Sequence, residues 1–128
     1  MPKGNYLRQK LIDHSLRNTA YTSPAAVYVA LYTSDPTNAD VGTEVSGGAY
    51  ARVAVTFTAP TTSGATENSG TITFPTATAN WGTVTHFAIR DAASGGNLLY
   101  YNALTNPRSV LNGDTPKFTA GDLDVSES

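Results

Sequence analysis

The residues best suited to acid–base chemistry are two histidines, His14 and His86, and neither has a catalytic partner that the sequence reveals. A Ser or Cys nucleophile needs a base that a third group orients. The chain contains no Cys, and it has no Gly-x-Ser-x-Gly motif. We predict that His86 is a strand residue whose imidazole bonds to a hydroxyl or carbonyl group. We therefore assign no catalytic residue and predict that the chain is not an enzyme.

The acidic residues lack the spacing of a metal site. Asp122 and Asp124 fall on one face of a predicted strand, and Asp35 and Asp40 flank a loop. Neither pair matches the calcium-binding loop, which has a central Gly and a terminal Glu. The sequence also offers few residues for a sugar-binding cleft, because Trp81 is the only Trp. We predict no metal and no other cofactor.

The sequence has no phosphate-binding motif either. Gly47-Gly48 and Gly95-Gly96 precede predicted strands rather than helices, so neither forms a phosphate loop. The formal net charge is −2, and the basic residues of the predicted strands are scattered singly, so we expect no nucleic-acid partner. No segment is long and apolar enough to span a bilayer or resembles a signal peptide. We expect no membrane partner and folding in a cytosol.

The composition favours a single all-β domain. Only 14% of the 128 residues are charged and 40% are hydrophobic, whereas an ordinary soluble domain has about 25% charged residues. Ser and Thr take much of the place of charge, and Thr suits strands because its branched Cβ packs well on a pleated surface. The length allows one core. The exposed faces should be neutral and rich in hydroxyl groups.

Alternating residues and turn signals predict about seven short strands. Residues 26–33 carry apolar side chains on both faces, so this strand must be buried on both sides or covered by a partner. Asn112-Gly113 predicts a hairpin that pairs residues 110–111 with residues 115–118. The other predicted strands are residues 49–58, 71–74, 84–90, 98–104 and 123–125, with polar loops at 35–48 and 60–70. This spacing is typical of an antiparallel β-sandwich or a Greek-key barrel.

The segment from Asn5 to Asn18 is the only good helix candidate. Asn5 can cap it, and its apolar residues cover about half of the circumference. Lys and Arg occupy much of the remaining surface, with Asp13 as the only acid. So short a helix is marginal alone and must dock on its own domain or on a neighbouring subunit; the sequence does not choose. We divide the chain into a helical arm, residues 1–20, and a β-sandwich domain, residues 21–128.

Two groups of residues are candidates for a protein interface. Tyr is enriched at interfaces because it buries a large area and keeps a polar tip. Low charge and a strand with two apolar faces favour oligomerisation or docking. The predicted interface residues are Leu7, Leu11, Leu16 and Arg17 of the arm, and Tyr28, Tyr32, Tyr50 and Tyr100 of the strands.

Five stretches carry a resemblance to a known family. They are residues 28–36 (YVALYTSDP), 44–52 (EVSGGAYAR), 74–87 (FPTATANWGTVTHF), 91–100 (DAASGGNLLY) and 112–114 (NGD). They resemble a family of small structural proteins of tailed bacteriophages, often described as tail-fibre or virion proteins. The resemblance covers nearly the whole chain and departs from the family at the acidic end, residues 122–128. It implies a non-enzymatic protein of the virion, assembled in the cytoplasm of the host bacterium.

The resemblance leaves the position on the particle open. A fibre needs a coiled coil, a triple β-helix or repeats, and this sequence has none of them. We therefore expect a capsid decoration (cement) protein that binds the major capsid protein or other virion proteins as a symmetric homo-oligomer, a dimer or trimer. The alternative is a tail-fibre or tail-tip module that binds a receptor. A lectin or small carbohydrate-active enzyme stays open as a third reading, to be tested through Trp81.

Overall fold

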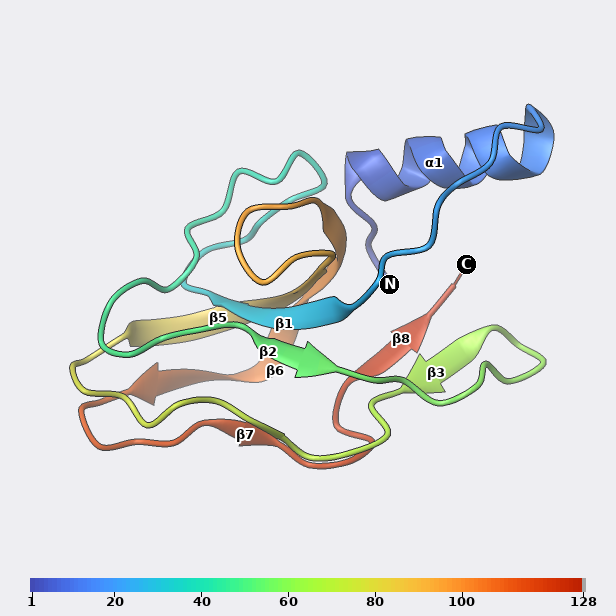
Figure 1. Cartoon of the computed structure of the whole chain (residues 1–128). Coiled ribbons are helices and arrows are strands. Elements are labelled where there is room, and N and C mark those ends of the chain that lie inside the picture. The colour runs from blue at the N-terminus through green and yellow to red at the C-terminus, as the bar shows by residue number, and fades with distance from the viewer. Residues whose placement is uncertain (128) are drawn as a thin grey trace.

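The computed structural model describes residues 1–127 and contains one helix followed by strands of two to thirteen residues (Figure 1). The helix is α1 (Asn5–Leu16). The strands are β1 (Val27–Tyr32), β2 (Val53–Val55), β3 (Ala65–Glu67), β4 (Ile72–Thr73), β5 (Gly82–Arg90), β6 (Leu98–Val110), β7 (Lys117–Phe118) and β8 (Asp124–Ser126). Within residues 1–127, no helix is long and apolar enough to cross a membrane.

The strands form an antiparallel sandwich. Four of them make the main sheet in the order β2-β1-β5-β6, and two short ribbons, β3-β8 and β4-β7, make the opposing layer (Figure 1). The rings of Phe87 in β5 and Phe118 in β7 lie 6.4 Å apart between the layers, and the ring of Phe74 lies 6.2 Å from that of Phe118. The predicted sandwich is confirmed, and the strands do not close into the Greek-key barrel that was the alternative.

The predicted hairpin at Asn112-Gly113 is wrong. The chain does turn there, since the amide of Asp114 donates to the carbonyl of Leu111 at 2.9 Å. However, β6 ends in the main sheet opposite Gly82, and β7 pairs with β4 in the other layer. The turn therefore carries the chain between layers, where Phe118 joins the aromatic core. The expected polar loop at 60–70 likewise contains a strand, β3, which pairs with β8.

Both faces of β1 and β5 are buried, as the alternation of residues 26–33 predicts. On the inner face, Val29 and Leu31 belong to the main core cluster. On the outer face, Ala30 and Ala88 are completely buried in a second, smaller cluster. The loop of residues 33–48 folds over this outer face, as its buried Pro36 and its hydrogen bonds to the sheet indicate (Figure 1). The second face of the central strands is thus covered by the chain itself.

The first residues of the chain are part of the fold. The amide of Gly4 donates to the carbonyl of Leu99 at 2.9 Å, and the amide of Tyr101 donates to the carbonyl of Pro2 at 3.2 Å, so this segment pairs antiparallel with the edge of β6. Gly4 precedes the helix without a side-chain cap, so the expected cap by Asn5 is wrong. A Cβ at Gly4 would collide with the carbonyl of Leu98. The segment therefore needs a glycine to approach the sheet.

Candidate interaction surfaces

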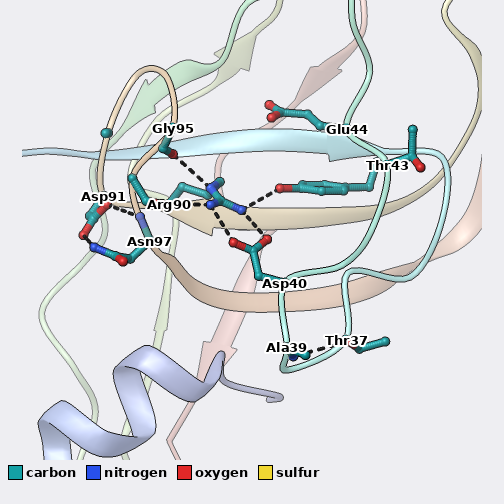
Figure 2. A network of polar contacts seen from close by, with 12 residues as sticks. Thr37, Ala39, Asp40, Thr43, Glu44, Arg90, Asp91, Gly95 and Asn97 are labelled. Atoms are coloured by element: carbon teal, nitrogen blue, oxygen red, sulfur yellow. Dashed lines mark hydrogen bonds and ion pairs between the residues drawn. The ribbon is translucent and has the colours of Figure 1, made fainter.

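A buried arginine at the end of β5 holds the covering loop on the sheet (Figure 2). The side chain of Arg90 is only 7% exposed and donates two hydrogen bonds to the carboxylate of Asp40, at 2.6 and 2.8 Å. It also donates to the hydroxyl of Tyr32 at 2.8 Å and to the carbonyls of Gly95 and Gly96. The Asp40 carboxylate raises the pKa of Arg90 further above its usual value. Such two-pronged, charge-assisted bonding is among the strongest polar contacts in proteins.

A second arginine ties the far end of the same loop. Arg52 binds the carboxylate of Glu44 through two hydrogen bonds of 2.8 Å. Tyr50 donates to the same carboxylate at 2.6 Å and accepts the amide of Leu31 at 3.0 Å. Although burial opposes it, hydrogen bonding by Arg52 and Tyr50 holds the pKa of Glu44 below its usual value. Burial, together with Glu44, raises the pKa of the Tyr50 hydroxyl.

The two arginines share a backbone partner. Both Arg52 and Arg90 donate to the carbonyl of Gly95, in the turn that joins β5 to β6. This polar cluster therefore connects the loop of residues 33–48, the turn of residues 91–97 and the main sheet. Each charged group in it has its opposite partner, as buried charges require. We refer to these residues, Asp40, Glu44, Arg52 and Arg90 with Tyr32 and Tyr50, as the loop clamp.

The four predicted interface tyrosines lie in different environments. Tyr32 is 2% exposed, and the ring of Tyr50 packs edge-on against Trp81 at 5.3 Å. Tyr28 and Tyr100 are partly exposed. Tyr100 donates to Glu127 at 2.6 Å, and burial, with that carboxylate, raises its pKa. An interface role stays a prediction for all four, although Tyr32 and Tyr50 already serve the loop clamp.

The predicted interface residues of the arm divide along the helix. Leu7 is the buried residue of α1, at 5% exposed, and it belongs to the main core cluster. Leu11 is partly buried, and Leu16 is 78% exposed. Arg17, just beyond the helix, forms a 3.0 Å ion pair with Asp13. The helix is thus docked at its N-terminal turn, whereas its C-terminal turn keeps a hydrogen bond from Tyr21 to His14 and leaves the Leu16 side chain in solvent. Its interface role stays a prediction.

Two neighbouring hollows lie at the helix end of the molecule. The first, of about 380 Å³, lies under the helix. The second, of about 330 Å³, is an apolar opening between the two layers of the sandwich. The two hollows share Glu127. The first is lined by Lys3, Arg8, Leu11, Ile12, Ser15 and Leu16, and the second mainly by Val27, Phe57, Pro60, Ile89, Leu99 and Val125.

A larger groove of about 750 Å³ follows the outer half of β6. Here Thr85 alone lies opposite residues 104–107, so the strand bulges outward between Ala103 and Arg108. Pro107 stands in this exposed stretch, where a strand edge tolerates a residue without an amide hydrogen. Sequence reasoning ended this strand at Leu104 and missed the groove, because residues 104–109 show no apolar alternation.

The residues considered for catalysis take structural roles. The Nδ1 atom of His86 lies 2.8 Å from the hydroxyl of Thr85, which confirms the predicted hydroxyl partner. His14 accepts the amide of Tyr21 at 3.2 Å. Trp81 is buried and donates to the carbonyl of Gly48 at 2.8 Å, so it is not placed to stack on a sugar. Within residues 1–127, no group of three or more His, Cys, Asp or Glu residues could hold a metal ion.

Comparison with known proteins gives one informative match. A search of curated proteins finds no matching sequence. The model of one protein family, described as podophage GP4 fiber I protein gp80, matches residues 2–126. This range includes α1 and every strand from β1 to β8, and the match agrees with the resemblance seen in the sequence. The chain therefore belongs to the podophage GP4 fiber I protein gp80 family and has a structural role in a phage virion.

Proposed function

We propose that this chain is a non-enzymatic, globular component of the fibre apparatus of a phage. The observation that carries the proposal is the family match over residues 2–126, whose description names a fibre protein. The absence of coiled-coil or repeat sequence, which favoured a capsid protein, is compatible with a fibre-associated unit, because a fibre can include compact domains at its base or tip. The sequence alone favoured capsid decoration over a tail-fibre or tail-tip role. With the family match, we place the fibre role first.

The shape of the chain supports a unit attached through one side. The N-terminal amine of Met1 donates to the carbonyl of Ser126 at 3.1 Å, so both ends of the described chain meet at one place. Figure 1 shows α1 and the β3-β8 ribbon projecting toward that same side. The loop clamp holds its loop through partners of the same chain. Attachment through the helix end leaves the rest of the domain exposed.

The test is the number and position of copies on the phage particle. Quantitative densitometry of purified particles should give a copy number far below that of the major capsid protein. Imaging of particles labelled at this protein should place the label on the tail. A copy number in proportion to the major capsid protein, with label over the shell, would refute the fibre assignment.

A capsid decoration protein is the second candidate, and the surface chemistry favours it. Short hydrogen bonds between hydroxyl groups link neighbouring segments of the exterior, such as Thr56 with Ser69 at 2.6 Å and Thr76 with Thr115 at 2.7 Å. A neutral, hydroxyl-rich surface suits a compact domain that stays permanently in solvent on a capsid. This candidate requires the high copy number that the fibre assignment forbids, so one measurement separates the two.

A further inference from the structure

The C-terminal half of α1 leaves two large apolar side chains exposed. The helix has twelve residues, and Leu7 is the buried one. Helices of this length are marginal in water unless an apolar face packs against something. Ile12 and Leu16 are 55% and 78% exposed, and they are two of the four large hydrophobic residues that stand exposed in the described chain. Their side chains form an uncovered apolar stripe, which Leu11 continues into the hollow under the helix.

A complementary apolar opening lies at the same end of the molecule. Its volume of about 330 Å³ is enough for two or three aliphatic side chains, and core residues such as Ile89 and Leu99 line it. Glu127 borders both this opening and the hollow under α1, so the two are neighbours. Figure 1 shows α1 above and the β3-β8 ribbon below. One chain therefore carries both an apolar projection and an apolar recess.

The charges at this end are also complementary. Within residues 1–127, Arg8 and Lys10 of α1 have no carboxylate within ion-pair distance. The β3-β8 ribbon has no basic residue, and its register places Glu67 directly opposite Asp124. Like charges directly opposite each other destabilise a strand pair. A nearby cation would stabilise the acidic ribbon, and a nearby anion would stabilise the basic face of the helix.

We propose that a second copy of this chain fills the helix end. In a two-fold arrangement, Ile12 and Leu16 of each copy enter the opening of the other copy, and Arg8 and Lys10 approach the acidic ribbon. A two-fold contact uses the same surface twice, so it requires a surface that is complementary to itself. The helix end meets this requirement, because projection, recess and both signs of charge belong to one chain. The inference deepens the proposed function and rests on it for the setting of the dimer in the virion.

Analytical ultracentrifugation of the purified chain tests the dimer without any phage particle. The wild type should sediment at twice its mass of 13.4 kDa. The double variant Ile12→Gln, Leu16→Gln keeps residues that favour helices and should raise the dimer dissociation constant by about tenfold or more. Val41→Gln is the matched control, because Val41 is 70% exposed and lines neither hollow, and it should leave the constant unchanged. A monomeric or trimeric wild type, or an unchanged double variant, overturns the proposal.

The absence of cysteine allows a second test of the contact itself. A copy carrying Leu16→Cys is mixed with a copy carrying Pro60→Cys, whose residue lines the opening. Under mild oxidation this mixture should give disulfide-linked dimers between the two kinds of copy, whereas Val41→Cys mixed with Pro60→Cys should not. Equal linkage in both mixtures overturns the placement of the helix. These results do not depend on the copy number on particles, so this proposal and the fibre assignment can fail separately.

Discussion

The loop clamp and the helix end of the domain differ in their surface chemistry. At the loop clamp, buried arginines and carboxylates hold a long loop over the outer face of the sheet, and every charge has a partner in the same chain. At the helix end, apolar side chains reach solvent and Arg8 has no ion-pair partner in the described chain. The loop clamp is complete within one chain. The helix end has the character of a surface that a partner completes.

The loop clamp should contribute more to the stability of the single chain than the exposed part of the helix does. Removing one member of a buried ion pair leaves the other member desolvated and unpaired, which lowers the free energy of unfolding strongly. Changing an exposed apolar side chain costs the isolated chain little. Substitutions at the loop clamp should therefore lower the free energy of unfolding strongly, whereas those at the outer helix should affect association instead.

The largest effect is expected for Arg90→Ala. This change removes the five hydrogen bonds that the guanidinium group donates to Asp40, Tyr32 and two glycine carbonyls. Because Asp40 keeps partial access to water, we expect a loss of about 3 kcal/mol, at the low end for a broken buried pair. Urea denaturation measures it. Arg108→Ala, on the exposed edge of β6, is the control and should cost less than about 0.5 kcal/mol.

A smaller loss in the free energy of unfolding, about 2 kcal/mol, is expected for Leu7→Ala. Leu7 is 5% exposed and packs in the main core cluster, so its truncation leaves a cavity at the edge of the core. The same change at Leu16, which is 78% exposed, should cost less than about 0.5 kcal/mol when measured at a dilution that keeps the chain monomeric. Equal losses at the two positions would show that the helix is docked uniformly, against the difference drawn between its two halves.

Acid should weaken the loop clamp more than the helix end. The folded pKa of Glu44 is lowered, so its contribution to stability is complete above the unfolded pKa of about 4.5 and is lost as the pH falls through the folded value. The pKa of Glu127 is also lowered, by Lys3 and Tyr100 against the effect of burial, but its side chain is 46% exposed, so solvent screens it.

Chemical denaturation over a pH series tests this difference. Glu44→Gln should flatten the loss of stability below pH 4.5, and Glu127→Gln should flatten it less. A Glu44→Gln curve parallel to that of the wild type would contradict the assignment of acid sensitivity to the loop clamp.

The sequence predicts elements whose signal is local and misses those that depend on distant partners. The strand of residues 26–33 is visible because its alternation is a property of neighbouring residues. The strand β3 is hidden, because Ala65–Glu67 has no apolar alternation and becomes a strand only against β8. The pairing of β7 with β4 is hidden for the same reason, since Phe118 meets Phe74 across more than forty positions of sequence.

The candidate site follows the same rule. The loop clamp could not be predicted, because Arg90 and Asp40 are separated by fifty positions and each looks like an isolated charge in the sequence. Leu7 and Leu16 are nine positions apart, which is about 180° around a helix, so they mark opposite edges of the apolar half of α1. Periodicity identified these apolar residues, but only the docking of the helix shows that Leu7 is buried and Leu16 is exposed.

The smallest effect expected is a gain of stability at the edge of the loop clamp. Ala49 follows two glycines and has a φ of 67°, in the left-handed region that an L residue with a Cβ occupies at a cost. Ala49→Gly relieves this strain, but the added glycine makes the unfolded chain more flexible and offsets part of the gain. We expect a net stabilisation of about 0.5 kcal/mol, measured by urea denaturation beside the wild type. Because Ala49 joins the clamped loop to the strand region that carries Tyr50, a loss of stability instead would mean that the Ala49 methyl group contributes packing that outweighs its backbone strain.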